Sequence, residues 1–241
     1  DANGVLITAD VELDGATVEV ATGISGAHTL TLDGTTSVAV AGTVSTTDLT
    51  TDTAATIGTV NIGGDLSVNG GTLTTDVGGV TVGGTATTTA AVNSAGGVAV
   101  TGDTSLGGSV TAVGLIDLDD ANGVLITADV ELDGATVEVA TGVSGAHTLT
   151  LDGATSVDVA GTVSTTNLTT DTAATIGTVS IGGDLSVNGG TLTTDVGGVT
   201  VAGAATTTAA IDSAAGVAVT GDTSLGGSVT AVGLIDLDDA N

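Results

Sequence analysis

The chain is a tandem repeat, and no other feature constrains its fold so strongly. Residues 1–119 recur as residues 120–238 with ten substitutions, and residues 239–241 repeat the first three residues of the unit. A unit that recurs at a fixed spacing indicates an architecture in which each repeat stacks on its neighbour. We therefore expect a first repeat at 1–119, a second at 120–238 and the start of a third at 239–241, within a longer array.

Each repeat contains a shorter period of about twenty residues. Triplets in which two apolar residues flank a variable one recur at steps of 18 to 22 residues. In the first repeat these triplets begin at Val18, Val38, Val60, Val80, Val98 and Ile116. Further triplets lie between them, for example at 11–13, 30–32 and 66–68. The spacing predicts about six turns of about 20 residues in each 119-residue repeat, with two or three strands per turn.

The residues of each turn favour strands. Apolar and polar side chains alternate in the triplets, and Val, Ile and Thr have high strand propensity. Between the triplets lie the turn-forming residues Gly, Asp, Asn and Ser, and the 40 glycines disfavour helix. The substitutions Ala39/Asp158 and Asn61/Ser180 fall at the middle of a triplet, which places that position on the outside. We predict an all-β fold, a parallel β-solenoid (β-helix) that runs as one continuous solenoid through both repeats.

One alternative is a string of immunoglobulin-like sandwiches, each 119 residues long. A sandwich of that size usually has large aromatic side chains in its core, and this chain has no Phe, Tyr or Trp. A sandwich also requires no twenty-residue period. A solenoid has a narrow interior that is repeated at every turn, and Val, Ala, Leu and Ile suit it. Both observations favour the solenoid.

The charge of the chain restricts its chemistry. It has 28 acidic residues, no Lys or Arg and only two His, so its formal net charge is −28. Nucleic acid would be repelled, and no side chain is available to clamp a phosphate. The absence of Cys removes disulfides and thiol nucleophiles, and no run of about 18 apolar residues predicts a membrane span. We expect a protein that is not an enzyme, requires no cofactor and binds no nucleic acid.

Several stretches of the sequence resemble the repeats of giant bacterial surface proteins. They are residues 26–32 (GAHTLTL), 69–76 (NGGTLTTD) and 102–108 (GDTSLGG), and the likeness extends over both repeats. In these stretches the chain is similar to the filamentous-haemagglutinin-like, β-strand-repeat adhesins. The resemblance implies a secreted, right-handed parallel β-helix that serves as a long stalk or fibre.

An acidic cluster near the junction of the repeats is the candidate metal site. Its members are Asp117, Asp119, Asp120 and Asn122, and in the second copy Asp236, Asp238 and Asp239. Calcium takes about six to eight oxygen ligands, and carboxylate and amide oxygens in a turn can supply several of them. The cluster matches neither the EF-hand loop nor the nonapeptide of calcium-binding β-rolls. Three interpretations stay open: specific binding of calcium or another divalent cation, loose condensation of cations, and a solvated turn.

Other candidate residues carry weaker signals. His28 and His147 occupy the same position in the two repeats and are the only bases that titrate near neutral pH. Ser25 and Ser144 lie nearby, but no spacing indicates a Ser–His–Asp triad, and we assign no catalytic residue. Threonine runs such as 87–89 are candidates for the flat ladders of ice-binding solenoids or for ordinary outward strand residues.

These observations predict a structural role. We expect a non-catalytic tandem-repeat segment of a secreted or cell-surface extracellular fibre or stalk. The expected partner is the protein itself, because the strand edges at the ends of a solenoid must be covered by further covalent repeats or by chains stacked head to tail. Lateral packing into filaments is expected to depend on cations that screen the carboxylates. The alternative is an adhesin or an ice-binding solenoid with a ligand-binding face.

Overall fold

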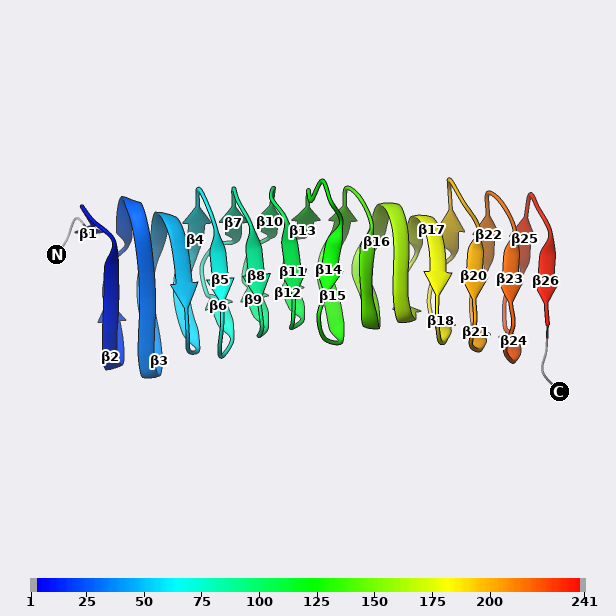
Figure 1. The fold of residues 1–241 in the computed structure, drawn as a ribbon, viewed down its shortest axis with the longest axis horizontal. Coiled ribbons are helices and arrows are strands. Elements are labelled where there is room, and N and C mark those ends of the chain that lie inside the picture. Colours follow the sequence, from blue (N-terminus) through cyan, green and yellow to red (C-terminus); the bar gives the residue numbers. More distant parts are fainter. Residues whose placement is uncertain (1–3, 239–241) are drawn as a thin grey trace. The chain divides into compact units, whose positions relative to one another are not determined.

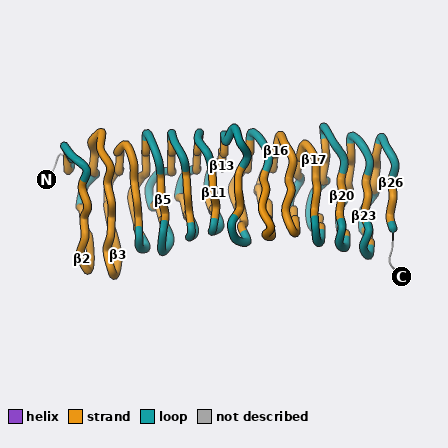
Figure 2. Tube along the Cα trace, in the orientation of Figure 1, coloured by secondary structure: helices purple, strands orange, loops and turns teal. Residues whose placement is uncertain are grey.

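The computed structural model describes residues 4–238, and all the regular structure in this range is β-strand (Figures 1 and 2). The chain divides into two compact units, Asp1–Asp120 (unit 1) and Ala121–Asn241 (unit 2). Between residues 4 and 238 there is no long apolar helix of the kind that crosses a membrane. The all-β prediction is confirmed.

The strands of unit 1 are long near its N-terminal end and short beyond it. Their bounds are β1 (Val5–Leu6), β2 (Val11–Val20), β3 (Ile24–Thr51), β4 (Ala55–Ile62), β5 (Leu66–Val68), β6 (Leu73–Thr75), β7 (Val80–Val82), β8 (Ala86–Thr88), β9 (Val92–Ser94), β10 (Val98–Val100), β11 (Thr104–Leu106), β12 (Val110–Ala112) and β13 (Leu115–Leu118). The long strands pass through corners without losing their extended backbone, whereas bends separate the short strands.

Unit 2 repeats this order. Its strands are β14 (Val124–Ile126), β15 (Val130–Val139), β16 (Val143–Thr170), β17 (Ala174–Ile181), β18 (Leu185–Val187), β19 (Leu192–Thr194), β20 (Val199–Val201), β21 (Ala205–Thr207), β22 (Ile211–Ser213), β23 (Val217–Val219), β24 (Thr223–Leu225), β25 (Val229–Ala231) and β26 (Ile235–Leu237). Because the two units have nearly the same sequence, nearly every strand of unit 2 has its counterpart 119 residues earlier.

In both units, three-residue strands in the middle of the unit pair in parallel with the third strand after them. In unit 1, β5 pairs with β8, β6 with β9 and β7 with β10. In unit 2, β18 pairs with β21, β19 with β22 and β20 with β23. Three strands therefore complete one turn, and the parallel pairing of successive turns makes each unit a β-solenoid. Over residues 4–238 the two units contain about 13 turns of about 18 residues, rather than turns of about 20.

The order of stacking differs from the expected ladder in one detail. The apolar triplets predicted that Val60 follows Val38 on the same ladder, with turns of about 20 residues. Instead Val38 stacks on Ala55, and Val60 stacks on Val44. Residues 55–57 form the missing strand of the turn, and the small Ala55 conceals it in the sequence. A narrow core accepts Ala in one turn and Val in the next, so the apolar pattern does not identify which triplets share a face.

The core of each unit consists of aliphatic side chains that point inward from every turn. A three-residue strand such as β7 buries its first and third residues and exposes the middle one. Val60, Val80 and Val98 stack directly on one another, and each is at most 4% exposed. Burial of apolar surface contributes about 25 cal/mol per Å², so these ladders hold the turns together.

Glycine is required at one tight corner of each unit. Gly71 has a φ of +64°, and its counterpart Gly190 has a φ of +63°. A side chain on Gly71 would also collide with the backbone of Ala54 in the preceding turn. Only glycine combines this left-handed backbone with so close an approach between turns.

Candidate functional site

The acidic cluster begins on the outer side of β13 in unit 1. Asp117 lies between the fully buried residues Ile116 and Leu118, and it is half-buried itself. Burial raises the pKa of the Asp117 carboxyl above its ordinary value, and the nearby charge of Asp119 raises it further. Asp119 is exposed. This pair of carboxylates is thus a site of local repulsion.

Asp120, the next member of the cluster, helps to join two turns of unit 1. Its side chain is only 1% exposed. Its Oδ2 atom accepts a hydrogen bond of 2.7 Å from the backbone N–H of Thr104. A buried carboxylate that accepts a backbone N–H satisfies a donor that would otherwise be costly to bury.

The remaining predicted ligands are exposed. Asn122 lies at the surface of unit 2, and Asp236 and Asp238 are exposed at the last described turn, whereas Asp239 lies outside the described residues. Between residues 4 and 238, no group of three or more His, Cys, Asp or Glu side chains is placed to hold a metal ion. Specific calcium binding by this cluster stays a prediction, to be checked by thermal melts in millimolar calcium against sodium of matched ionic strength.

The two histidines occupy equivalent surroundings in the two units. The Nδ1 atom of His28 lies 3.8 Å from Oδ1 of Asp10. The Nδ1 atom of His147 lies 4.0 Å from Oδ1 of Asp129. Both Asp side chains are more than three-quarters exposed, so water screens these contacts strongly. Each pair also lies at a corner where Asp accepts a backbone N–H, from Thr29 at 3.0 Å in unit 1.

That hydrogen bond belongs to a row of Asp side chains that links successive turns. In unit 1, Oδ1 of Asp48 accepts from the backbone N–H of Asp65, and Oδ1 of Asp65 accepts from the backbone N–H of Thr85, both at 2.8 Å. In unit 2, the amide oxygen of Asn167 accepts from the backbone N–H of Asp184, also at 2.8 Å. Some of the acidic side chains therefore stabilise the coil by linking one turn to the next.

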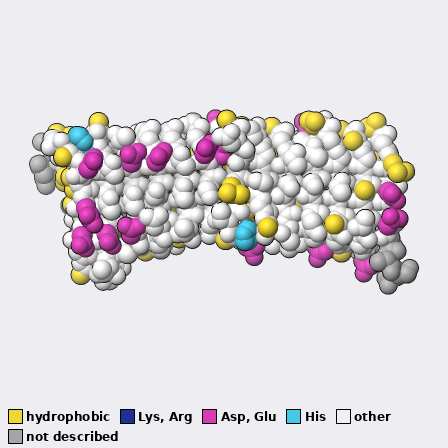
Figure 3. Space-filling model, in the orientation of Figure 1, with side chains coloured by type: hydrophobic (Ala, Val, Ile, Leu, Met, Phe, Trp, Pro, Cys, Tyr) yellow, Lys and Arg dark blue, Asp and Glu magenta, His cyan; other side chains and the backbone are white. Residues whose placement is uncertain are grey.

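The acidic side chains also set the character of the surface. Figure 3 shows carboxylates gathered over the first turns of unit 1 on the face in view. No Lys or Arg exists in the chain to pair with them. Because exposed like charges within about 8 Å repel one another at physiological ionic strength, this surface favours cations.

A row of hydroxyl groups runs along one face of each unit. The middle residues of β5, β8 and β11 are Ser67, Thr87 and Ser105, and they stack in register. Thr50 of β3 continues the row, because it pairs with Ser67. The same row in unit 2 comprises Thr169, Ser186, Thr206 and Ser224. Their spacing along the sequence is irregular. They still align because the corners between the strands differ in length.

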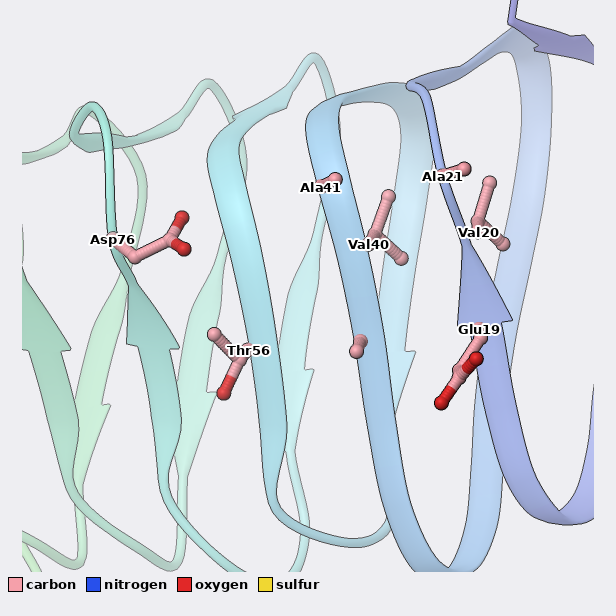
Figure 4. Close-up of a pocket in the computed structure, with 8 residues that line it drawn as sticks. Glu19, Val20, Ala21, Val40, Ala41, Thr56 and Asp76 are labelled. Atoms are coloured by element: carbon pink, nitrogen blue, oxygen red, sulfur yellow. The ribbon is translucent and has the colours of Figure 1, made fainter. Parts of the chain in front are cut away.

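Unit 1 also carries a shallow hollow of about 410 Å³ (Figure 4). We call it the Ala39 hollow, and its lining is Glu19, Val20, Ala21, Ala39, Val40, Ala41, Thr56 and Asp76. Glu19, Ala39 and Thr56 are neighbours in register on β2, β3 and β4. The surface is recessed at Ala39 because this residue has only a methyl group, whereas the adjacent turns have longer side chains at the same position.

Sequence reasoning did not find this hollow. The place of Ala39 in the middle of a triplet predicts that it points outward, which agrees with its exposure. One feature of the sequence does indicate a recessed surface. The middle residues of two successive triplets, Glu19 and Ala39, differ greatly in side-chain length. Asp76 carries no such signal, because its place beside the hollow depends on the lengths of three intervening turns.

Comparison of the chain with protein-family models, with curated proteins and with solved structures found no match in any of the three.

Proposed function

We propose that the chain is a structural, non-catalytic segment of an extracellular fibre or stalk. The observation that carries this proposal is the continuous parallel stacking within each unit, in which Val60, Val80 and Val98 form an unbroken ladder. A coil that stacks one turn on the next extends by repetition, and a further repeat adds length without requiring a new fold. The resemblance to repeats of bacterial surface proteins supports a secreted, cell-surface setting.

The ends of such a coil favour self-association. Val217 is 2% exposed, but Ile235, which stacks on it in the last described turn, is 41% exposed. In the first strand of unit 1, Val5 is 41% exposed, whereas Ile24, its ladder neighbour, is 1% exposed. Uncovered strands and apolar side chains at an end are covered by another turn, either in the same chain or in a second copy.

The length of concatenated repeats tests this proposal. Strands stack at about 4.8 Å, so a 119-residue repeat of six to seven turns adds about 30 Å. Proteins of two, four and six repeats should appear by electron microscopy as rods whose length increases by that amount per repeat. Globular beads, or an increment that differs greatly, contradict the proposal. A broad hydrolase screen should give only background rates, and activity lost with His28→Ala and His147→Ala together contradicts the non-catalytic role.

Ice binding is the second candidate, and the in-register hydroxyl row favours it. Ser67, Thr87 and Ser105 repeat at the strand spacing, which gives the regular array that an ordered water layer would require. Thermal hysteresis and ice recrystallisation assays test it, with Thr87→Lys and Thr206→Lys as disrupting variants. Activity that these substitutions abolish supports ice binding, and inhibition no stronger than that of an unrelated acidic protein excludes it.

A further inference from the structure

We propose that the Ala39 hollow of unit 1 binds a linear aliphatic diammonium ion. The chemical class is an alkyl chain with one ammonium group at each end. The proposal concerns a binding site and is independent of the structural role of the coil. It stands on the shape of the hollow, on the placement of Glu19 and Asp76, and on one substitution in unit 2.

The hollow has an apolar floor between two carboxylates. Ala39 and Ala41 present exposed methyl groups there, whereas Val40 between them is buried in the core. Glu19 and Asp76 lie on opposite sides of these residues, as Figure 4 shows. An alkyl chain that lies over the methyl groups is removed from water, while its two ends reach the two carboxylates.

The ladder of this face sets the distance between the two ends. Val18 stacks on Val38, Val38 on Ala55 and Ala55 on Leu73. Glu19 follows the first residue of this ladder, and Asp76 follows the strand of the last. Three steps of about 4.8 Å separate their turns by about 14 Å along the coil. Asp76 also lies two residues, about 7 Å, beyond Thr74, the position in register with Glu19, and both side chains bridge part of the span.

This geometry suits a diammonium ion better than a single metal ion. Calcium requires several oxygen ligands within about 2.3–2.6 Å of one point. Carboxylates on turns so far apart do not converge on such a point, and residues 4–238 hold no group of three acidic or histidine side chains placed for a metal. An ion with two charges on a flexible chain pairs with each carboxylate separately. No Lys or Arg in the chain competes for them.

Unit 2 contains a natural variant of the hollow. Of the eight lining residues, seven are identical in unit 2, and Ala39 alone is replaced, by Asp158. Asp158 pairs in register with Glu138 on one side and with Thr175 on the other. Thr175 is half-buried, whereas its counterpart Thr56 is exposed. The longer side chain thus occupies the middle of the face where the alkyl chain would lie.

The difference in charge between Asp158 and Ala39 separates binding in the hollow from diffuse binding. Diffuse attraction between polyamines and an acidic protein increases with each added negative charge. The substitution Ala39→Asp adds a charge but fills the hollow, and Asp158→Ala removes a charge but opens an equivalent hollow in unit 2. Binding in the hollow and diffuse binding therefore predict opposite changes for both variants.

The experiment is a methyl NMR titration of the whole 241-residue chain with diamines from propane-1,3-diamine to octane-1,8-diamine. Hexylamine, with one charge, is the control ligand. We expect shifts at Ala21 and Ala41 but not at Ala140 and Ala160, with a preferred chain length. Ala39→Asp should weaken binding about fivefold, and Asp158→Ala should add shifts at Ala140 and Ala160. Glu19→Gln and Asp76→Asn should each weaken binding about two- to fivefold, as expected for exposed ion pairs.

Several results overturn the proposal. They are equal shifts in the two units, tighter binding by the Ala39→Asp variant, and affinity that rises with charge but shows no preferred chain length. Each identifies diffuse counterion binding instead. Because unit 2 already folds with Asp at this position, the Ala39→Asp variant is expected to keep the fold, which circular dichroism and the unit 2 resonances verify.

Discussion

Unit 1 and unit 2 differ in ten residues, and the distribution of these differences shows which features of the coil are required. Gly83 and Gly96 are replaced by Ala202 and Ala215 in unit 2. In contrast, every glycine with a positive φ in unit 1 is again glycine in unit 2. A Cβ on Gly83 would lie 2.5 Å from the carbonyl oxygen of Gly63, yet unit 2 accommodates an alanine there. Small backbone shifts relieve a close approach, but they do not relieve a left-handed backbone.

The polar substitutions also leave the required features of the coil intact. Asp48 is replaced by Asn167, which keeps the hydrogen bond to the backbone of the next turn. Ala39 is replaced by Asp158 on the outer surface, where the interior is unaffected. The two aliphatic exchanges, Ile24/Val143 and Val92/Ile211, stay within the core, and all four side chains are at most 3% exposed. The coil therefore depends on inward aliphatic groups, on side-chain acceptors at the corners and on a few left-handed glycines.

The largest expected effect is at a left-handed glycine. Gly71→Ala should lower the free energy of unfolding by about 2 kcal/mol or more, because a left-handed backbone costs alanine about 1–2 kcal/mol and the collision with Ala54 adds to it. Gly83→Ala, which unit 2 already carries as Ala202, is the matched control and should cost much less. Denaturant unfolding measures both. Equal losses of stability would mean that close contacts, rather than the sign of φ, determine the cost of replacing these two glycines.

A buried threonine should give a change of opposite sign. The hydroxyl of Thr51 is buried and has no hydrogen-bond partner among the described residues, and its ladder neighbour is Val68. Thr51→Val should raise the free energy of unfolding by about 1–2 kcal/mol, because it removes an unsatisfied polar group. Thr75→Val is the control and should be destabilising, since the Thr75 hydroxyl donates to the carbonyl of Gly78 at 2.6 Å. A destabilised Thr51→Val variant would show that its hydroxyl has a partner.

The exchange of Asp48 for Asn167 can be reproduced within unit 1. Asp48→Ala should lower the free energy of unfolding by about 1 kcal/mol, because the backbone N–H of Asp65 loses its acceptor. Asp48→Asn should cost little, since Asn167 accepts the same bond in unit 2. Thermal melts of the two variants under identical salt conditions measure the difference. Equal behaviour would assign the role of Asp48 to its charge rather than to its hydrogen bond.

The smallest expected effect concerns the pH dependence at Asp117. Its raised pKa means that the folded state holds this proton more tightly than the unfolded state does. Its contribution to stability therefore falls as the pH rises from the ordinary pKa of Asp through the raised value, and stays unfavourable at neutral pH. Asp117→Asn should raise the melting temperature slightly at pH 7 and have no such benefit at low pH. Asp236→Asn, at the exposed counterpart, controls for the loss of one charge.

Much of the local structure can be predicted from the sequence, because buried and exposed residues alternate within single strands. In β7, Val80 and Val82 are buried and Thr81 is exposed, as the alternation of the triplet requires. The all-β class follows from the same pattern. The candidate sites were harder to predict. The cluster of Asp117, Asp119 and Asp120 is contiguous in sequence, yet its members differ in burial, because a strand and a corner direct successive side chains differently.

The sequence by itself determined which side of each strand faces the core, because alternate side chains of a strand point to opposite faces whatever the strand packs against. Only the tertiary structure decided which strands stack. Val44 pairs with Val60 sixteen residues later, but Val60 pairs with Val80 twenty residues later, so no single period gives the register. Corners take up different numbers of residues, and the strands on either side of them still pair in parallel. That adjustment places Glu19, Ala39 and Asp76 around one hollow, which their positions in the sequence do not reveal.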